Sequence, residues 1–315
     1  MTSPSPQSLS RPAGKSPTGL LAIEPAKSLL LLFCIWLVCY LLISALYTFV
    51  LSRFPSPEKA LRIGSVLQDL ILFILPALAT AMLSTRLPAT LLAIDCQPRL
   101  RTVFYAVFAL FFSTPAMEWI VQWNNSLQLP ESMSAIENWM RNAEQSATSS
   151  INLVLGGKDV GSLVVSILIV GVLAGLSEEL LFRGALQRIL YAWIRNAHMA
   201  IWISAILFSA MHFQFYGFVP RLLLGAFFGY LLWWSGSLWL PVIAHMMNNT
   251  LFVVVRWMGL RHGMSPENIS AQAPGNTIDI IYIIASVVLS ALCLWAVYRT
   301  CRTGAQTKPA PDALD

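Results

Sequence analysis

The chain has 315 residues, of which 57% are hydrophobic and only 11% are charged. Soluble globular domains carry about 25% charged residues, so this composition excludes an ordinary water-soluble enzyme, a collagen-like chain and a disordered chain. It indicates an integral membrane protein with several spans, whose apolar side chains face lipid. The formal net charge of +5 fits loops at the membrane surface. Because no basic cluster is interleaved with exposed aromatic residues, we expect no nucleic-acid partner.

Long apolar runs follow a short polar N-terminal stretch. Residues 1–27 are rich in Ser and Pro without hydrophobic periodicity, and predict a flexible tail. The next run is too long for a cleaved signal peptide, and a spanning helix needs about 20 residues. We therefore predict an all-α bundle of about eight transmembrane helices, of which the fifth is the shortest. The predicted spans are Ser28–Leu51, Ser65–Leu83, Thr102–Trp123, Val160–Leu181, Met199–Phe213, Phe218–Trp234, Leu238–Trp257 and Thr277–Tyr298.

One polar segment, Asn124–Lys158, separates the third predicted span from the fourth. Its apolar residues Met133, Ile136, Trp139 and Met140 recur at helical spacing. Two interpretations are equally supported: an amphipathic helix on the membrane surface, or a solvated loop. The five cysteines are an odd number without CxxC spacing, so neither a disulfide framework nor a thiolate zinc site is indicated.

The distribution of basic residues predicts the orientation in the membrane. Eight spans place both termini on one side, which would then hold 12 of the 20 Lys and Arg residues against 8 on the opposite side. Cytoplasmic loops are enriched in Lys and Arg, so we predict cytoplasmic termini, in a bacterial inner (plasma) membrane.

Polar residues inside the predicted spans mark the candidate site. An ionisable residue there costs about 2.5–3.5 kcal/mol on insertion scales, and such residues usually serve a function. In the second half of the chain they form three clusters: Glu178, Glu179 and Arg183; Phe208 and His212; and His245 and Asn249. In the first half, Asp69 and Glu118 have no evident partner, and we expect both near an interface.

The spacing within these clusters separates structural from chemical roles. Glu179 and Arg183 are four residues apart with the acid first, the favourable order for a helical ion pair. Glu178 is rotated by about 100° from Glu179 and has no partner in its own helix. Desolvation favours the protonated form of such a carboxylate, which suits a general base. His245 and Asn249 share a helix face and must point into the bundle or a wet cavity, although hydrogen bonding between helices would also explain them.

The order of the motifs adds a resemblance to a known family. Glu-Glu-x-x-x-Arg, Phe-x-x-x-His and His-x-x-x-Asn on successive spans resemble the CPBP family of intramembrane proteases, which includes the type II CAAX prenyl endopeptidases and the bacterial Abi proteins. Gly236–Pro241, which precedes His245, is also similar to this family. The resemblance implies a protease core over residues 160–257, after a variable transmembrane region at 28–159 that contains the amphipathic segment 124–158. The last transmembrane helix and a C-terminal tail then occupy 258–315.

The resemblance also implies roles for individual residues. Glu178 and His212 would activate a water molecule, and His245 and Asn249 would polarise the scissile carbonyl and stabilise the oxyanion. The supporting residues would be Glu179, Arg183 and Phe208. Glu178, His212 and His245 could also ligate zinc. The family is commonly labelled metalloprotease but is also described as glutamate proteases without metal, and we favour no obligatory zinc.

The predicted function is hydrolysis of a peptide bond in a membrane-embedded or membrane-associated substrate. Motifs of other intramembrane proteases are absent from the sequence: there is no HExxH, no Gly-x-Gly-Asp and no Gly-x-Ser-x-Gly. Two alternatives stay open. One is a non-catalytic protein, such as a bacteriocin-immunity or scaffold protein, and the other is a transporter that uses Glu178, His212 and His245 as a proton relay.

Overall fold

The computed structural model describes residues 19–54, 56–265 and 280–306, and these residues form helices without strands. This confirms the predicted all-α class. The first half contains α1 (Pro25–Arg53), α2 (Pro57–Gln68), α3 (Leu75–Ser84), α4 (Pro88–Leu91), α5 (Leu100–Asn125) and α6 (Ser134–Val154). The second half contains α7 (Val160–Ser166), α8 (Ala174–Glu179), α9 (Arg188–Ile194), α10 (Ala197–Ala210), α11 (Phe218–Ser235), α12 (Trp239–Arg261) and α14 (Ile280–Gln306). Residues 1–18 of the predicted tail and residues 307–315 lie outside the described part.

Several of these helices are continuous rods with π-helical segments inside them. The π-helical segment Asp69–Ile74 joins α2 to α3, and the segments Ile167–Leu173 and Leu180–Gln187 join α7, α8 and α9. A π-helical turn adds a residue to the helical repeat and shifts the side chains that follow it, and such turns are frequent at functional sites. Asp69 begins the first segment, and Glu178 and Glu179 directly precede the last one.

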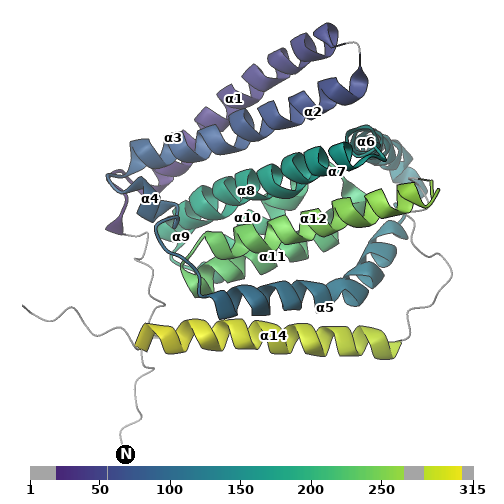
Figure 1. The fold of residues 1–315 in the computed structure, drawn as a ribbon. Helices are drawn as coiled ribbons and strands as arrows, with labels where there is room; N and C mark the ends of the chain where they lie inside the picture. Colours follow the sequence, from purple (N-terminus) through teal and green to yellow (C-terminus); the bar gives the residue numbers. More distant parts are fainter. Residues whose placement is uncertain (1–18, 55, 266–279, 307–315) are drawn as a thin grey trace, which may run out of the picture.

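The helices are arranged around a central group of α8, α10, α11 and α12 (Figure 1). The α1–α3 region covers one side of this group, and α5 and α14 cover the other. The largest apolar core lies between α1–α3, α4 and the Leu180–Gln187 segment, with Leu91, Phe182 and Leu238 fully buried. This core holds the helix that carries Glu179 and Arg183.

Small residues let the central helices approach closely. A Cβ added at Gly175 would lie 3.1 Å from the Met246 nitrogen, and one added at Gly171 would lie 2.6 Å from Thr250 Oγ1. The α7–α8 rod and α12 are therefore in contact at both glycines, as small residues allow in membrane helices. This contact brings Glu178 and Glu179 next to His245 and Asn249.

The packing of α5 against α14 satisfies backbone groups near a proline. Pro115 lies inside α5 and has no N–H to donate. Ser286 of α14 donates to the Phe112 carbonyl at 2.6 Å, and its hydroxyl accepts from the Ala116 N–H at 3.2 Å. One hydroxyl thus bridges the donor and the acceptor of a helical turn, which matters because lipid offers no replacement partner.

Six helices of the described chain are long and apolar enough to cross a bilayer: Pro25–Phe49, Pro57–Ser84, Leu100–Asn125, Val160–Ile194, Phe215–Ser235 and Ile280–Thr303. Ala197–Ala210 is apolar but shorter, and α12 carries several polar residues and is not among the six. Each predicted span coincides with a helix, except that residues 277–279 of the last one lie outside the described part. The protein is an integral, multi-pass membrane protein, and the number eight stays a prediction.

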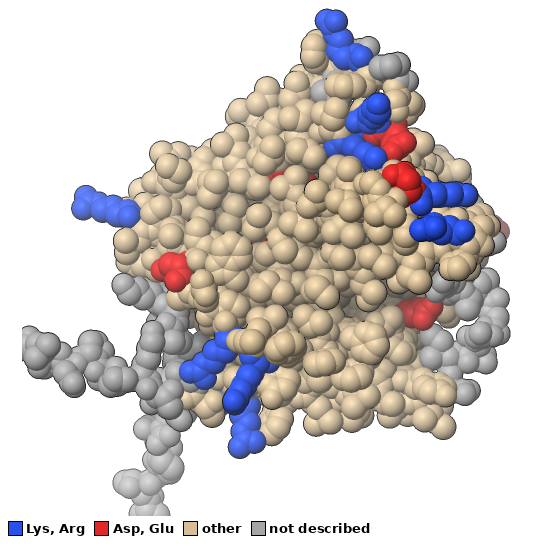
Figure 2. Space-filling view, viewed as in Figure 1, with Lys and Arg blue, Asp and Glu red and all other residues tan. Residues whose placement is uncertain are grey.

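The charges and chain ends agree with a membrane-spanning bundle. Figure 2 shows Lys, Arg, Asp and Glu mainly near the two ends of the helices, with a broad uncharged surface between them. The start of α1 and the end of α14 lie at the same end of the bundle, and α6 lies at the opposite end (Figure 1).

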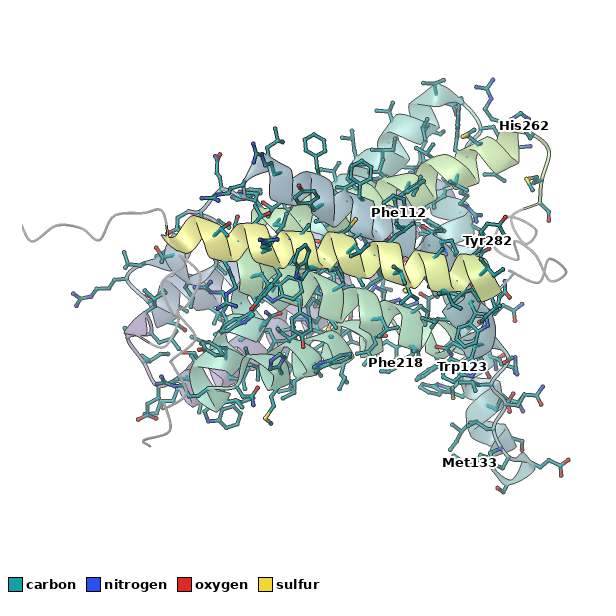
Figure 3. All side chains as sticks on the ribbon, turned by 90° about the horizontal axis from the view of Figure 1, so that it is seen from below. Phe112, Trp123, Met133, Phe218, His262 and Tyr282 are labelled. Atoms are coloured by element: carbon teal, nitrogen blue, oxygen red, sulfur yellow. The ribbon has the colours of Figure 1, made fainter. Side chains whose placement is uncertain are left out.

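The segment Asn124–Lys158 contains a helix, α6, rather than only a loop. Figure 3 places Met133, just before α6, away from the bundle, whereas Trp123 and Phe218 lie close together. Asn124 fixes the end of α5 beside them, since its side chain donates to the Phe215 carbonyl at 3.2 Å and accepts from the Val219 N–H at 2.8 Å. The chain therefore leaves α5 at a fixed point before it enters α6.

Candidate active site

A cavity of about 680 Å³ lies inside the bundle. Its lining residues come from α1, α2, α6, the α7–α9 rod, α10, α11 and α12. Four residues predicted for the site, Glu178, His212, His245 and Asn249, line this one cavity. The structure thus brings together side chains that are up to 71 residues apart in the sequence.

Glu179 and Arg183 form the ion pair that their spacing predicts. Arg183 Nη1 lies 2.9 Å from Glu179 Oε1, and both side chains are fully buried. Arg183 Nη2 donates to the Gly225 carbonyl at 2.9 Å, and the guanidinium lies 4.4 Å from the centre of the Phe208 ring. Carboxylate, carbonyl and aromatic ring together offset the cost of burying the arginine.

Glu179 also contacts a residue of another helix, which spacing within its own helix could not predict. His245 Nδ1 donates to Glu179 Oε1 at 2.8 Å, so Glu179 holds the histidine as well as the arginine. A carboxylate can only accept, so Nδ1 carries a proton. The Phe228 ring stacks on the imidazole, with centroids 4.7 Å apart and planes 16° apart. His245 is thereby fixed in position and in tautomer, and assigning Glu179 to the ion pair alone was incomplete.

Glu178 faces the other nitrogen of the same imidazole. Its Oε2 lies 3.7 Å from His245 Nε2, beyond hydrogen-bonding distance, and its side chain is 14% exposed. With Nδ1 protonated, a neutral His245 has an acceptor at Nε2, and an ionised Glu178 is also an acceptor. Two acceptors this close require a proton on one of them or a water between them. The arrangement suits proton transfer.

His212 is held by the backbone of the preceding helical turn. Its Nδ1 donates to the Phe208 carbonyl at 2.9 Å, which leaves Nε2 as the acceptor of the neutral ring. The Phe208 ring packs edge-on against both histidines, with centroids 5.1 Å from His212 and 5.9 Å from His245. Phe213 follows with φ 52°, a left-handed conformation that turns the chain after His212.

The side chains of Asn248 and Asn249 of α12 are hydrogen-bonded to each other, and Asn249 is also bonded to the α7–α9 rod. Asn249 Nδ2 donates to the Val170 carbonyl at 3.1 Å, and Asn249 Oδ1 accepts from Asn248 Nδ2 at 3.3 Å. An amide has two N–H bonds, so one N–H of Asn249 is still available. Asn248 also lines the cavity, although its helical position predicts a different face from that of His245.

Asp69 is a cavity residue that the sequence placed wrongly. We expected it near an interface, but it is 5% exposed, lines the cavity and accepts from Ser177 Oγ at 3.0 Å. Arg221 lines the cavity too and was not singled out at all. For both Asp69 and Arg221, the sequence feature that could have indicated a site was a charged residue within or next to an apolar run. Glu118, the other outlier, is not among the lining residues.

The residues do not fit a metal centre. Within the described chain, no three His, Cys, Asp or Glu side chains lie together as ligands of one ion. This holds for Glu178, His212 and His245, which could ligate zinc by residue type.

Comparison with known proteins agrees with the class that the fold and cavity define, a multi-pass membrane protein with a polar site inside its helices. Residues 160–251 match the family described as type II CAAX prenyl endopeptidase Rce1-like. This match contains all three motifs and confirms the resemblance drawn from them.

One curated relative is similar over a shorter stretch. The chain is 25% identical over 111 residues to the uncharacterized protein YpbD of Bacillus subtilis (strain 168), which covers 34% of this chain and 54% of that protein. The chain thus spans about half the length of this relative. No solved structure matches the chain.

Proposed function

We propose that this protein is an intramembrane endopeptidase of the CPBP type, which hydrolyses a peptide bond in a membrane-embedded or membrane-associated substrate. The observation that carries this proposal is the cavity in which Glu178, His212, His245 and Asn249 meet. Peptide hydrolysis needs a base for water, an acid for the leaving amine and donors for the oxyanion, and this set contains each of them.

Glu178 and His212 activate the water in this proposal. Glu178 lines the cavity. Glu179 is fully buried, and its Oε1 already accepts hydrogen bonds from Arg183 and His245. Glu178 takes a proton from the water, which His212 Nε2 helps to hold, as the water oxygen forms a bond to the carbonyl carbon. When the tetrahedral intermediate collapses, the carbon–nitrogen bond breaks and the proton passes to the departing amine.

His245 and Asn249 stabilise the oxyanion. Glu179 holds Nδ1 of His245, and a proton shared between Glu178 and His245 Nε2 supplies an N–H that can donate to the developing negative charge. The remaining N–H of Asn249 supplies a second donor. Glu179, Arg183 and Phe208 keep these donors in place, much as a buried carboxylate orients the histidine of a catalytic triad.

The position of the cavity in the bundle, together with the predicted orientation in the membrane, indicates the side of the membrane toward which its α6 wall lies. The cavity is lined in part by α6, which lies at the end of the bundle opposite the start of α1 and the end of α14 (Figure 1). With cytoplasmic termini in a bacterial inner membrane, as the basic residues predict, the part of the cavity lined by α6 lies toward the side of the membrane away from the cytoplasm.

The experiment is cleavage of fluorogenic membrane peptides by the purified protein in liposomes. His212→Ala should lose at least 99% of wild-type turnover, because His212 shares the activation of water. His198→Ala is the matched control, since His198 is exposed and bonds Tyr230 outside the cavity, and it should cleave like wild type. If the wild type cleaves nothing, or if His212→Ala cleaves as fast as His198→Ala, the proposal fails and a non-catalytic role leads.

A further inference from the structure

Arg221 is a cavity residue to which the proposed chemistry gives no role. It lies in the first turns of α11 and lines the same cavity as Glu178 and His212. In the part of the chain that the structure describes, no carboxylate oxygen lies within 4.0 Å of its guanidinium. A guanidinium withdrawn from bulk water without a directly bonded carboxylate favours an anion that can bond it.

Gln214 holds the guanidinium in place and bridges it to Glu144. Arg221 Nη1 donates to the Gln214 carbonyl at 3.2 Å, and Nη2 donates to Gln214 Oε1 at 3.1 Å. Gln214 Nε2 in turn donates to Glu144 Oε1 of α6 at 3.2 Å. The glutamine side chain thus stands between the two charges, and these two bonds leave other N–H groups of the guanidinium for a ligand.

The surrounding backbone leaves room for the arginine. A Cβ added at Gly217 would lie 2.6 Å from Arg221 Nη2, so a larger residue at 217 would displace the guanidinium from this position. Glu144 Oε2 accepts from the Tyr216 N–H at 3.3 Å, which fixes the same loop to α6. Gln214, Gly217 and α6 together preorganise Arg221 as a donor, which is a property of binding sites rather than of solvated surface arginines.

We propose that Arg221 binds a carboxylate of the peptide substrate and so sets which peptide bond reaches Glu178. This inference rests on the proposed peptidase function, because Arg221 and the catalytic set share one cavity. The guanidinium fork matches a carboxylate in geometry and charge. The carboxylate is either the C-terminal group of the substrate or an acidic side chain at a fixed distance from the scissile bond.

The helix α6 favours a peptide over a lipid headgroup as the source of the anion. Ala147, Ser150 and Ile151 of α6 line the cavity. The end of α6 is tied down as well, since Arg62 Nε donates to the Val154 carbonyl at 3.1 Å and Arg256 Nη2 donates to Asn152 Oδ1 at 2.6 Å. Because α6 is held at Glu144, Asn152 and Val154, the anion at Arg221 lies beside a fixed helix rather than at an open surface, and we take it to come from the peptide substrate.

The test compares pairs of membrane peptides in liposomes of zwitterionic lipid. One pair differs in a C-terminal acid or amide, and the other has Glu or Gln at one internal position. Wild type should prefer the acidic member of one pair by about ten- to a hundred-fold in kcat/KM, the range for a charge-assisted hydrogen bond. Arg221→Gln should cleave both members equally, and Arg221→Lys should keep part of the preference. Arg101→Gln is the matched control, since Arg101 is exposed on α5 and is not among the lining residues of the cavity, and it should keep the full preference.

Three results would overturn the assignment. Wild type could cleave acid and amide equally in both pairs, or Arg221→Gln could keep the preference. A preference that phosphatidylglycerol in the liposomes abolishes would show that lipid headgroups occupy Arg221. Binding of the same labelled peptides to Glu178→Gln separates this inference from the proposed function: a preference in binding that Arg221→Gln removes supports the carboxylate site even if no variant cleaves.

Discussion

The two halves of this membrane protein carry different kinds of information. Residues 160–251, which match the family, hold the acid, the histidines and the amide that can perform chemistry. The preceding half has no recognisable motif, yet it supplies Asp69 and the α6 residues that line the same cavity. The comparison teaches that the groups proposed for chemistry come from one half of the chain, whereas both halves supply the walls around them. Chemistry and the proposed contact of Arg221 with the substrate should therefore depend on the second half, and access past α6 should depend on the first.

The largest effect is expected at the buried ion pair of the second half. Arg183→Ala removes the guanidinium that Glu179 and the Gly225 carbonyl share, and leaves a buried charge with His245 as its remaining partner. Breaking such a pair costs about 3–5 kcal/mol, so we expect a low yield of folded protein and a lower Tm in detergent. Arg299→Ala, on the exposed side of α14, should leave Tm nearly unchanged. A normal Tm for Arg183→Ala would move Arg183 from a structural role toward substrate binding.

A smaller effect separates the two asparagines of α12. Asn249→Ala removes a donor to the proposed oxyanion, and we expect turnover to fall about a hundred-fold, the scale of one oxyanion-hole donor. Asn248→Ala removes only the group that donates to Asn249 Oδ1, so its loss should be milder. Measurements of kcat on both variants decide the point. A larger loss at Asn248 would mean that the wrong asparagine has been assigned.

The smallest effect belongs to the first half and concerns pH. Hydrogen bonds from Arg141 and from the Leu129 N–H hold the pKa of Glu137 below its usual range. The folded protein thus binds this proton less readily than the unfolded chain, so the stabilising contribution is present at neutral pH and is lost as the pH falls through the lowered pKa. The protection factors for hydrogen exchange at Leu129 and in the first turn of α6 should therefore fall at acid pH, with no matching change around Glu179. An equal fall in both places would contradict the independence of the two halves.

Local spacing in the sequence predicted much of the site. The Glu179–Arg183 pair and the common face of His245 and Asn249 depend on the helical repeat, which is a property of neighbouring residues. Contacts between helices depend on packing, so the bonds from Ser177 to Asp69 and from His245 to Glu179 could not be derived from spacing. The same holds for α6, where composition allowed a helix or a loop and the contacts of Glu144 and Asn152 with distant residues accompany the helix.

The fold shows the same division. Apolar runs predicted where helices lie, because a helix in lipid must be apolar along most of its length. They did not predict the π-helical segments at Asp69–Ile74 and Leu180–Gln187, since these arise where packed helices must shift their side chains. Zinc ligation was likewise open from residue types alone, and within the described chain Glu178, His212 and His245 do not lie together as ligands of one ion.

The central claim is that Glu178 is the general base and Glu179 orients His245, and paired substitutions test it most directly. The measurement is the cleavage rate of one membrane peptide by purified, folded Glu178→Gln and Glu179→Gln in liposomes, with Tm as the check on folding. Glu178→Gln keeps the shape of the side chain but cannot accept a proton, so we predict a folded protein without detectable cleavage. Glu179→Gln loses charge at the ion pair and at His245, so we predict a lower Tm with residual cleavage. Cleavage by Glu178→Gln near the wild-type rate would contradict the assigned mechanism and favour a non-catalytic protein.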